Sequence, residues 1–197
     1  YTTKKRAFKL LKQFGGGGLP ETVTKIMKDM RYPEISSDEA NSGDLVLISG
    51  PCAIESRDHS MKMAEAIGKI CKKLDIKWIF KACYDKDCRS SPNSFHGLGL
   101  EEGLQVLSDV RTEIGVPVTS DFSDASWANA TGEVCDLVQI PAYLCRQTSI
   151  LRAAAETKVP VHLKKGQFMS PWNMKNSCRK LEGFGCDHIL LTERGTF

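Results

Sequence analysis

Short apolar runs alternate with longer segments of helical period from residue 44 onward, and this alternation constrains the fold more than any other feature. Each run is too short for a helix, and several are rich in β-branched residues. The runs cover residues 45–49, 76–82, 116–120, 137–140, 160–163 and 188–192, and the helical segments cover 60–74, 100–114, 150–158 and 173–183. Six strands alternating with helices predict an α/β fold with a parallel sheet, which is either open and doubly wound or a barrel.

Polar and reactive side chains gather at the ends of these runs. They are Cys52, Lys81, Lys86, Arg89, Asp121, Gln139, Lys164, Lys165, Glu193 and Arg194. Convergence of such residues at the carboxyl ends of consecutive strands is typical of the mouth of a TIM (β/α)8 barrel. No GxGxxG follows the first run, which argues against a dinucleotide-binding sheet. A single lysine at the end of a buried strand is explained equally well by an aliphatic stem that carries its ammonium to solvent. Five cations at one mouth instead indicate a site for phosphate and carboxylate groups. These cations are Lys81, Lys86, Arg89, Lys164 and Arg194.

The length of the chain bears on this interpretation. A complete barrel of this type takes roughly 250 residues, whereas the sequence has 197. If the barrel interpretation holds, we expect an incomplete barrel that is truncated after about strand six. We assign residues 44–197 to this partial barrel and residues 1–43 to an N-terminal extension, in which a basic amphipathic segment precedes Gly15 to Gly18.

Composition excludes several classes of protein. The net charge is only +3, with 27 basic residues scattered among 24 acidic ones, so nucleic-acid binding gains little support. No apolar run approaches the roughly 18 residues of a membrane span. The eight cysteines include no CxxC pair, and we interpret them as reduced thiols of a cytoplasmic protein. The basic residues 1–14 also fit an organellar transit remnant.

Several stretches then identify a family. They are LISGPCAIES (47–56), IFKACYDKDCRSS (79–91), FHGLGLEEGL (95–104), VQIPAYLCRQT (138–148), LKKGQFMSPW (163–172) and LTERGTF (191–197). Because these stretches occur in this order, the chain resembles the 3-deoxy-D-manno-octulosonate-8-phosphate synthases over about residues 45–197. The sister 3-deoxy-arabino-heptulosonate-7-phosphate synthases share GPC and ERG, but PAYLCRQT and KKGQF favour the octulosonate branch.

The resemblance implies condensation of phosphoenolpyruvate with arabinose 5-phosphate, which yields an eight-carbon sugar phosphate of lipopolysaccharide or plant pectin. It implies that Lys86 and Asp121 act in catalysis near the reacting centre. It further implies that phosphoenolpyruvate is held by Lys81, Lys86, Gln139, Lys164 and Arg194, and the aldose phosphate by Arg89 and Ser90. A neighbouring subunit often delivers the latter pair in this family, so we expect a homodimer or homotetramer.

Cys52 in the GPC motif is typical of the metal-dependent branch, whereas asparagine is typical of the metal-independent branch. The resemblance therefore implies a divalent ion such as zinc, iron or manganese on Cys52, with the other ligands beyond residue 197. The alternative is a thiol that simply packs as a small hydrophobe. Cys71, by contrast, is expected on the exposed face of a helix.

Three departures from the family pattern leave the aldose open. Asp87 and Cys88 stand where the family has alanine and asparagine, Ser123 replaces a histidine, and His96 replaces an arginine. Erythrose 4-phosphate as the aldose, or a catalytically inactive fragment, therefore remain alternatives. For His59, His162 and His188 we expect packing or surface roles, and for the three tryptophans we expect core or interface positions.

Overall fold

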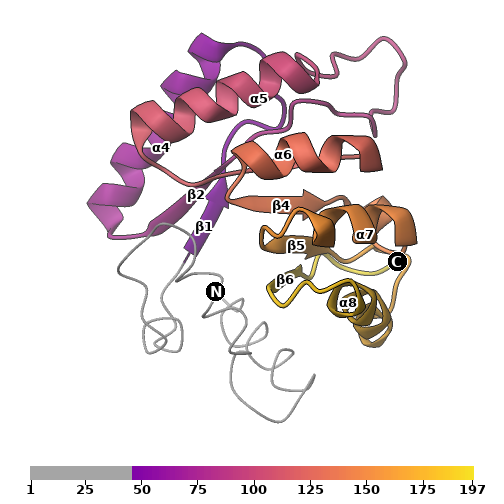
Figure 1. Ribbon diagram of the computed structural model, residues 1–197. Helices are drawn as coiled ribbons and strands as arrows, with labels where there is room; N and C mark the ends of the chain where they lie inside the picture. The colour runs from indigo at the N-terminus through magenta and orange to yellow at the C-terminus, as the bar shows by residue number, and fades with distance from the viewer. Residues whose placement is uncertain (1–45) are drawn as a thin grey trace.

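Each of the six apolar runs forms a strand in the computed structural model, which describes residues 46–197 (Figure 1). The strands are β1 (Val46–Ser49), β2 (Lys77–Lys81), β3 (Val118–Asp121), β4 (Leu137–Ile140), β5 (Val161–Lys164) and β6 (Ile189–Thr192). All neighbouring pairs are parallel, and the order in the sheet is β1-β2-β3-β4-β5-β6. A doubly wound sheet would reverse its strand order, so this sequential order confirms the predicted partial barrel.

Helices connect the strands and cover the outside of the curled sheet (Figure 1). They are α4 (Arg57–Leu74), α5 (Leu100–Asp109), α6 (Ala128–Val134), α7 (Thr148–Glu156) and α8 (Met174–Gly183). A π-helical turn, η1 (Val110–Ile114), continues α5, and 3-10 turns occupy η2 (Ala125–Trp127), η3 (Ala142–Leu144) and η4 (Pro171–Asn173). The short helix α6 was not predicted, because its seven residues include Gly132 and are too few to display a periodic pattern.

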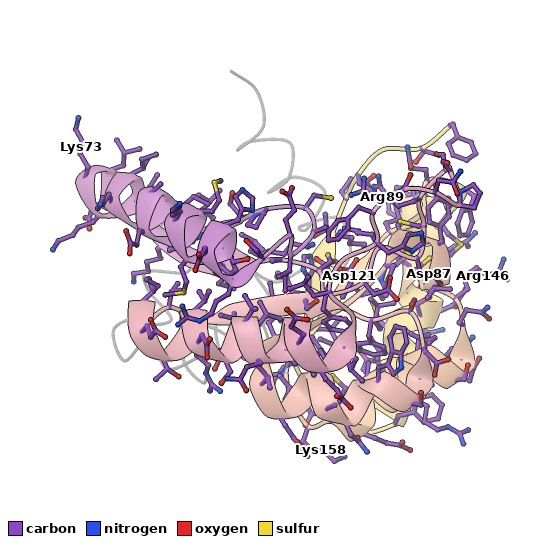
Figure 2. All side chains as sticks on the ribbon, turned by 90° about the horizontal axis from the view of Figure 1, so that it is seen from above. Lys73, Asp87, Arg89, Asp121, Arg146 and Lys158 are labelled. Atoms are coloured by element: carbon purple, nitrogen blue, oxygen red, sulfur yellow. The ribbon has the colours of Figure 1, made fainter. Side chains whose placement is uncertain are left out.

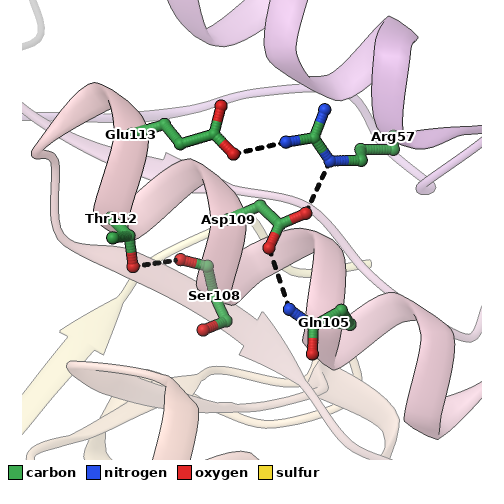
Figure 3. Close-up of polar contacts among 6 residues, drawn as sticks. All are labelled: Arg57, Gln105, Ser108, Asp109, Thr112 and Glu113. Atoms are coloured by element: carbon green, nitrogen blue, oxygen red, sulfur yellow. Dashed lines mark hydrogen bonds and ion pairs between the residues drawn. The ribbon is translucent and has the colours of Figure 1, made fainter.

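Arg57 joins the first of these helices to the second (Figure 3). Its guanidinium donates to Asp109 at 2.6 Å and also to Glu113, and Gln105 donates to the other oxygen of Asp109 at 2.8 Å. Arg57 thus links the start of α4 to the end of α5 and to η1.

The core has two parts on opposite faces of the sheet. The larger cluster fills the space between the sheet and the helices and includes Phe80, Leu107 and Leu151. The smaller cluster, which we call the barrel floor, consists of Val46, Ile48, Ile79, Leu137 and Leu190. Side chains two positions apart on a strand share a face. Lys81, Gln139 and Thr192 each lie two positions after a residue of the barrel floor. Their side chains therefore point to the same inner face of the curled sheet, nearer to its carboxyl end.

One prediction about the thiols is wrong. Cys71 is 4% exposed and belongs to the larger core cluster, because it lies on the same stripe of α4 as the buried Ala64. All eight cysteines are free thiols. Trp78 is in the core as expected, whereas Trp172 is 56% exposed.

The predicted N-terminal extension, residues 1–43, lies outside the described residues. Within 46–197, no helix is both long enough and apolar enough to span a membrane.

Candidate active site

The carboxyl ends of β2 to β5 bring the predicted polar residues to one end of the sheet. Lys81, Asp121 and Lys164 are the last residues of β2, β3 and β5. Asp121 is paired in register with Gln139 on β4. Gly50 allows this end to form, since a Cβ atom there would lie 2.1 Å from the carbonyl oxygen of Lys81. Figure 2 shows Asp121 in the interior, whereas Lys73 and Lys158 project from the periphery.

Three side chains make the tightest contacts at this end. The Lys81 ammonium donates to the Cys83 sulfur at 2.9 Å and lies 3.6 Å from Asp121 Oδ1. The Cys83 thiol donates to that same oxygen. Cys83 is fully buried, and the side chains of Lys81 and Asp121 are 17% and 12% exposed. No sequence pattern marks Cys83 as part of the site, although it lies between Lys81 and Lys86.

The pKa values describe a charged cluster. Burial would raise the pKa of Asp121, but Lys81 and Lys86 outweigh burial and lower it. Burial would lower the pKa of Lys86, yet the charge of Asp121 raises it instead. The pKa of Lys164 is lowered by burial and by repulsion from Lys81. Three ammonium groups thus surround one carboxylate, which leaves the cluster with excess positive charge and suits it to an anionic ligand.

Gln139 lies in this region with both amide atoms buried. The residue is 0% exposed, and neither its nitrogen nor its oxygen has a hydrogen-bond partner within residues 46–197. The hydroxyl of the fully buried Thr119 and Nδ1 of His162 are in the same situation. Unpaired buried polar groups cost roughly 1 to 3 kcal/mol each. Such groups are usual where a polar ligand or solvent completes the hydrogen bonding.

His162 faces the interior of the curl on β5, in register with Gln139. Its Nε2 shares a hydrogen bond with the hydroxyl of Thr192 on β6. Burial, followed by the charges of Lys164 and Lys81, lowers its pKa to about 4. The ring is therefore neutral at pH 7, and its position agrees with the packing role that we expected.

Lys165 has a role that the sequence analysis missed. Its side chain is buried, and its ammonium donates to the carbonyls of Gly166, Met169 and Gly195 at 3.2, 3.1 and 2.5 Å. It also donates to the Thr196 hydroxyl at 3.0 Å and pairs with Glu193 at 3.3 Å. Lys165 thus anchors the segment after β6, which carries the exposed Arg194.

A cavity of about 210 Å³ opens beside Asp121. Its lining comes from the ends of β2, β3 and β4 and consists of Asp85, Lys86, Asp87, Cys88, Asp121, Phe122, Ser123, Pro141, Tyr143 and Leu144. Arg89 lines a different hollow, together with Glu55, Ser94 and Phe95. Ser90 is exposed on the same loop. Arg89 and Ser90 are therefore not brought into the cavity beside Asp121.

Cys52 lies at the same end of the sheet, close enough to contribute to the raised pKa of Lys86. Its side chain is exposed. Among residues 46–197, however, no three His, Cys, Asp or Glu side chains are grouped so that they could hold a metal ion. The described residues alone therefore do not form the predicted divalent-metal site.

Comparison with known proteins decides the family. The DAHP synthetase I family matches residues 33–197. The chain belongs to this family. Proteins named 2-dehydro-3-deoxyphosphooctonate aldolase are similar to this DAHP synthetase I member, and these names agree with the predicted octulosonate branch. The one from Synechococcus sp. is 49% identical over 162 residues, which are 81% of this chain and 57% of the relative.

Two further relatives with this name show the same pattern. The one from Rickettsia canadensis is 50% identical over 156 residues, covering 79% of this chain and 57% of the relative. The one from Cyanothece sp. is 52% identical over 150 residues, covering 76% and 55%. The chain thus spans less than three fifths of the length of these relatives.

Proposed function

We propose that the longest natural form of this chain condenses phosphoenolpyruvate with arabinose 5-phosphate. In this reaction C3 of the enol phosphate forms a bond to the aldehyde carbon, and water adds to C2. Inorganic phosphate then leaves with cleavage of its C–O bond. The product is 3-deoxy-D-manno-octulosonate 8-phosphate. The proposal applies to the longest form because the described chain covers only part of its relatives.

The observation that carries this proposal is the group of three lysines around one carboxylate. Lys81, Lys86 and Lys164 meet at the carboxyl ends of the strands, where barrel enzymes bind their substrates. Phosphoenolpyruvate carries a carboxylate and a phosphate, and each can pair with ammonium or guanidinium groups. In this proposal Gln139 completes the phosphoenolpyruvate site with its amide, and Arg194 with its guanidinium.

The charge states favour particular roles. Lys86 keeps its proton because its pKa is raised, so it acts as a fixed positive charge that stabilises negative charge on the reacting phosphate. Asp121 remains ionised and stabilises positive charge that develops at C2, or orients the attacking water. The lowered pKa of Lys164 makes this ammonium readier to give up a proton.

The cavity beside Asp121 favours a polyhydroxylated partner. Asp85, Asp87 and Asp121 present carboxylates to it, and Ser123 and Tyr143 add hydroxyl groups. Carboxylates accept hydrogen bonds from sugar hydroxyls. We assign the aldose chain to this cavity and its phosphate to Arg89 and Ser90 of a neighbouring subunit, since Arg89 does not line this cavity within its own chain.

We also propose that the protein is a cytoplasmic homodimer or homotetramer. Large aromatic side chains are exposed on the loops around the mouth: Phe95, Tyr143, Phe168, Trp172 and Phe197. Exposed apolar groups of this kind are typical of protein interfaces. Light scattering coupled to size-exclusion chromatography tests the assembly.

Phosphate release tests the function. The longest natural form, incubated with phosphoenolpyruvate and arabinose 5-phosphate, should release phosphate, and erythrose 4-phosphate should support at most a small fraction of that rate. Asp121→Asn should abolish release while the variant remains folded. A higher rate with erythrose 4-phosphate would assign the chain to the heptulosonate reaction instead.

A further inference from the structure

We propose that Cys83 is a positioning residue, whose thiol fixes the Asp121 carboxylate and the Lys81 ammonium relative to each other. The consequence for catalysis rests on the proposed function. The position of the thiol between the two charged groups does not depend on that function.

The backbone around Cys83 holds its side chain in place. Cys83 lies two residues beyond β2 and pairs with Ala53, and its carbonyl accepts a hydrogen bond from the amide of Ile54 at 2.9 Å. The parallel pairing of β1 and β2 thus continues to this point. Because the residue is also fully buried, its sulfur has little freedom to move.

The thiol contacts both Lys81 and Asp121, which also pair with each other, and its proximity helps to raise the pKa of Lys86. Lys81 donates to the sulfur at 2.9 Å, the thiol donates to Asp121 Oδ1, and the ammonium lies 3.6 Å from that same oxygen. Burial, together with the nearby Asp121, raises the pKa of the Cys83 thiol, so it keeps the proton that this contact requires. The thiol thus contacts both members of the Lys81–Asp121 ion pair.

Cys83 acts through Asp121 and not on a ligand. Asp121 lines the cavity of about 210 Å³, whereas Cys83 is not part of its lining. The thiol therefore contacts the Asp121 carboxylate from outside the cavity lining. It therefore determines which way the carboxylate is presented to the cavity.

Two substitutions separate this role from packing. Cys83→Ser keeps a group that both donates and accepts, whereas Cys83→Ala removes it. In the longest natural form, Cys83→Ala should lower kcat about 10-fold with KM for phosphoenolpyruvate within about threefold of the parent. Cys83→Ser should stay within about threefold of the parent in both constants. Cys145→Ala is the matched control, because Cys145 is a fully buried core thiol for which kcat should not change.

An NMR titration of Asp121 tests the position of the thiol without any enzymatic assay. The Asp121 carboxylate is surrounded by Lys81 and Cys83, by Lys86 on the following loop, by Lys164 on β5 and by its register partner Gln139. Loss of the thiol proton donor should raise the pKa of Asp121, measured by carbon NMR, by at least about half a unit in Cys83→Ala but not in Cys83→Ser.

The outcomes are distinct. A parent protein that does not react with either aldose would contradict the proposed function, while the NMR titration would still test the position of Cys83. An unchanged Asp121 pKa in Cys83→Ala would overturn the positioning role. Equal loss of kcat in the serine and alanine variants, with both folded, would also overturn it.

Discussion

Lys165, directly after β5, and Glu193, directly after β6, form an ion pair of 3.3 Å between a buried ammonium and a half-exposed carboxylate. The same ammonium makes four hydrogen bonds, of which two reach Gly195 and Thr196, the two residues that follow Arg194. Lys165 thus holds the segment that carries Arg194, whose guanidinium we assign to phosphoenolpyruvate.

Lys165→Met should therefore destabilise the protein by roughly 2 to 3 kcal/mol, since it removes the ammonium donor from the carbonyls of Met169 and Gly195, whereas the Gly166 carbonyl keeps the amide of Met169. Chemical denaturation of the longest natural form measures this change. Lys175→Met, at an exposed position of α8, is the matched control and should cost no more than about 0.5 kcal/mol. Equal stability of the two variants would show that Lys165 is not an anchor.

Arg194→Ala should weaken phosphoenolpyruvate binding roughly 10- to 150-fold, because one charge-assisted pair contributes about 1.5 to 3 kcal/mol. Isothermal titration calorimetry measures the affinity. Arg179→Ala on the exposed face of α8 should leave it unchanged. Binding of Arg194→Ala within threefold of the parent would remove Arg194 from the site.

Gln139→Leu should separate binding from stability. Both amide atoms of Gln139 are buried without partners among the described residues, so an apolar side chain of similar size removes a desolvation cost. We expect the free energy of unfolding to be unchanged or up to about 2 kcal/mol higher, and phosphoenolpyruvate affinity to fall at least about 10-fold. Thr119→Val makes the same change at another unpaired buried group. A clear loss of stability in Gln139→Leu would mean that the amide serves the fold.

His162 should make folding sensitive to acid. Its pKa is about 4 in the folded protein and 6.5 in an unperturbed chain, so between these values the unfolded state binds more protons. The stabilisation from a neutral ring is complete above pH 6.5 and is lost as the pH falls towards 4, by roughly 3 kcal/mol in total. His162→Gln should therefore show a shallower loss of stability across this range in denaturant titrations. An identical pH dependence in the parent and the variant would contradict this account of the buried ring.

The sequence predicts the strands well, because each is a short apolar run with a polar residue or glycine at one end at least. All six observed strands begin and end within two residues of the predicted runs. Lys81, Asp121, Gln139 and Lys164 could be placed at one end because parallel strands share the direction of their carboxyl ends. The helix α6 could not be predicted from seven residues.

The sequence predicts which strand end carries a residue better than it predicts whether the side chain is buried. Lys164 and Lys165 are adjacent in sequence, yet only Lys165 is fully enclosed by backbone carbonyls, which depends on how the chain returns after β6. Cys71 was expected on the exposed face of a helix, but it lies on the same buried stripe of α4 as Ala64. The contacts of Cys83 require Asp121, which is 38 residues away in sequence.

The proposed condensation is tested most directly with phosphoenolpyruvate labelled with oxygen-18 in the bridging C–O–P position. The longest natural form is incubated with this substrate and arabinose 5-phosphate, and the phosphate and the sugar product are analysed by mass spectrometry. We expect one labelled phosphate for each molecule of the eight-carbon sugar phosphate, and no phosphate without the aldose. Unlabelled phosphate, or phosphate release that does not require the aldose, would contradict the proposed condensation.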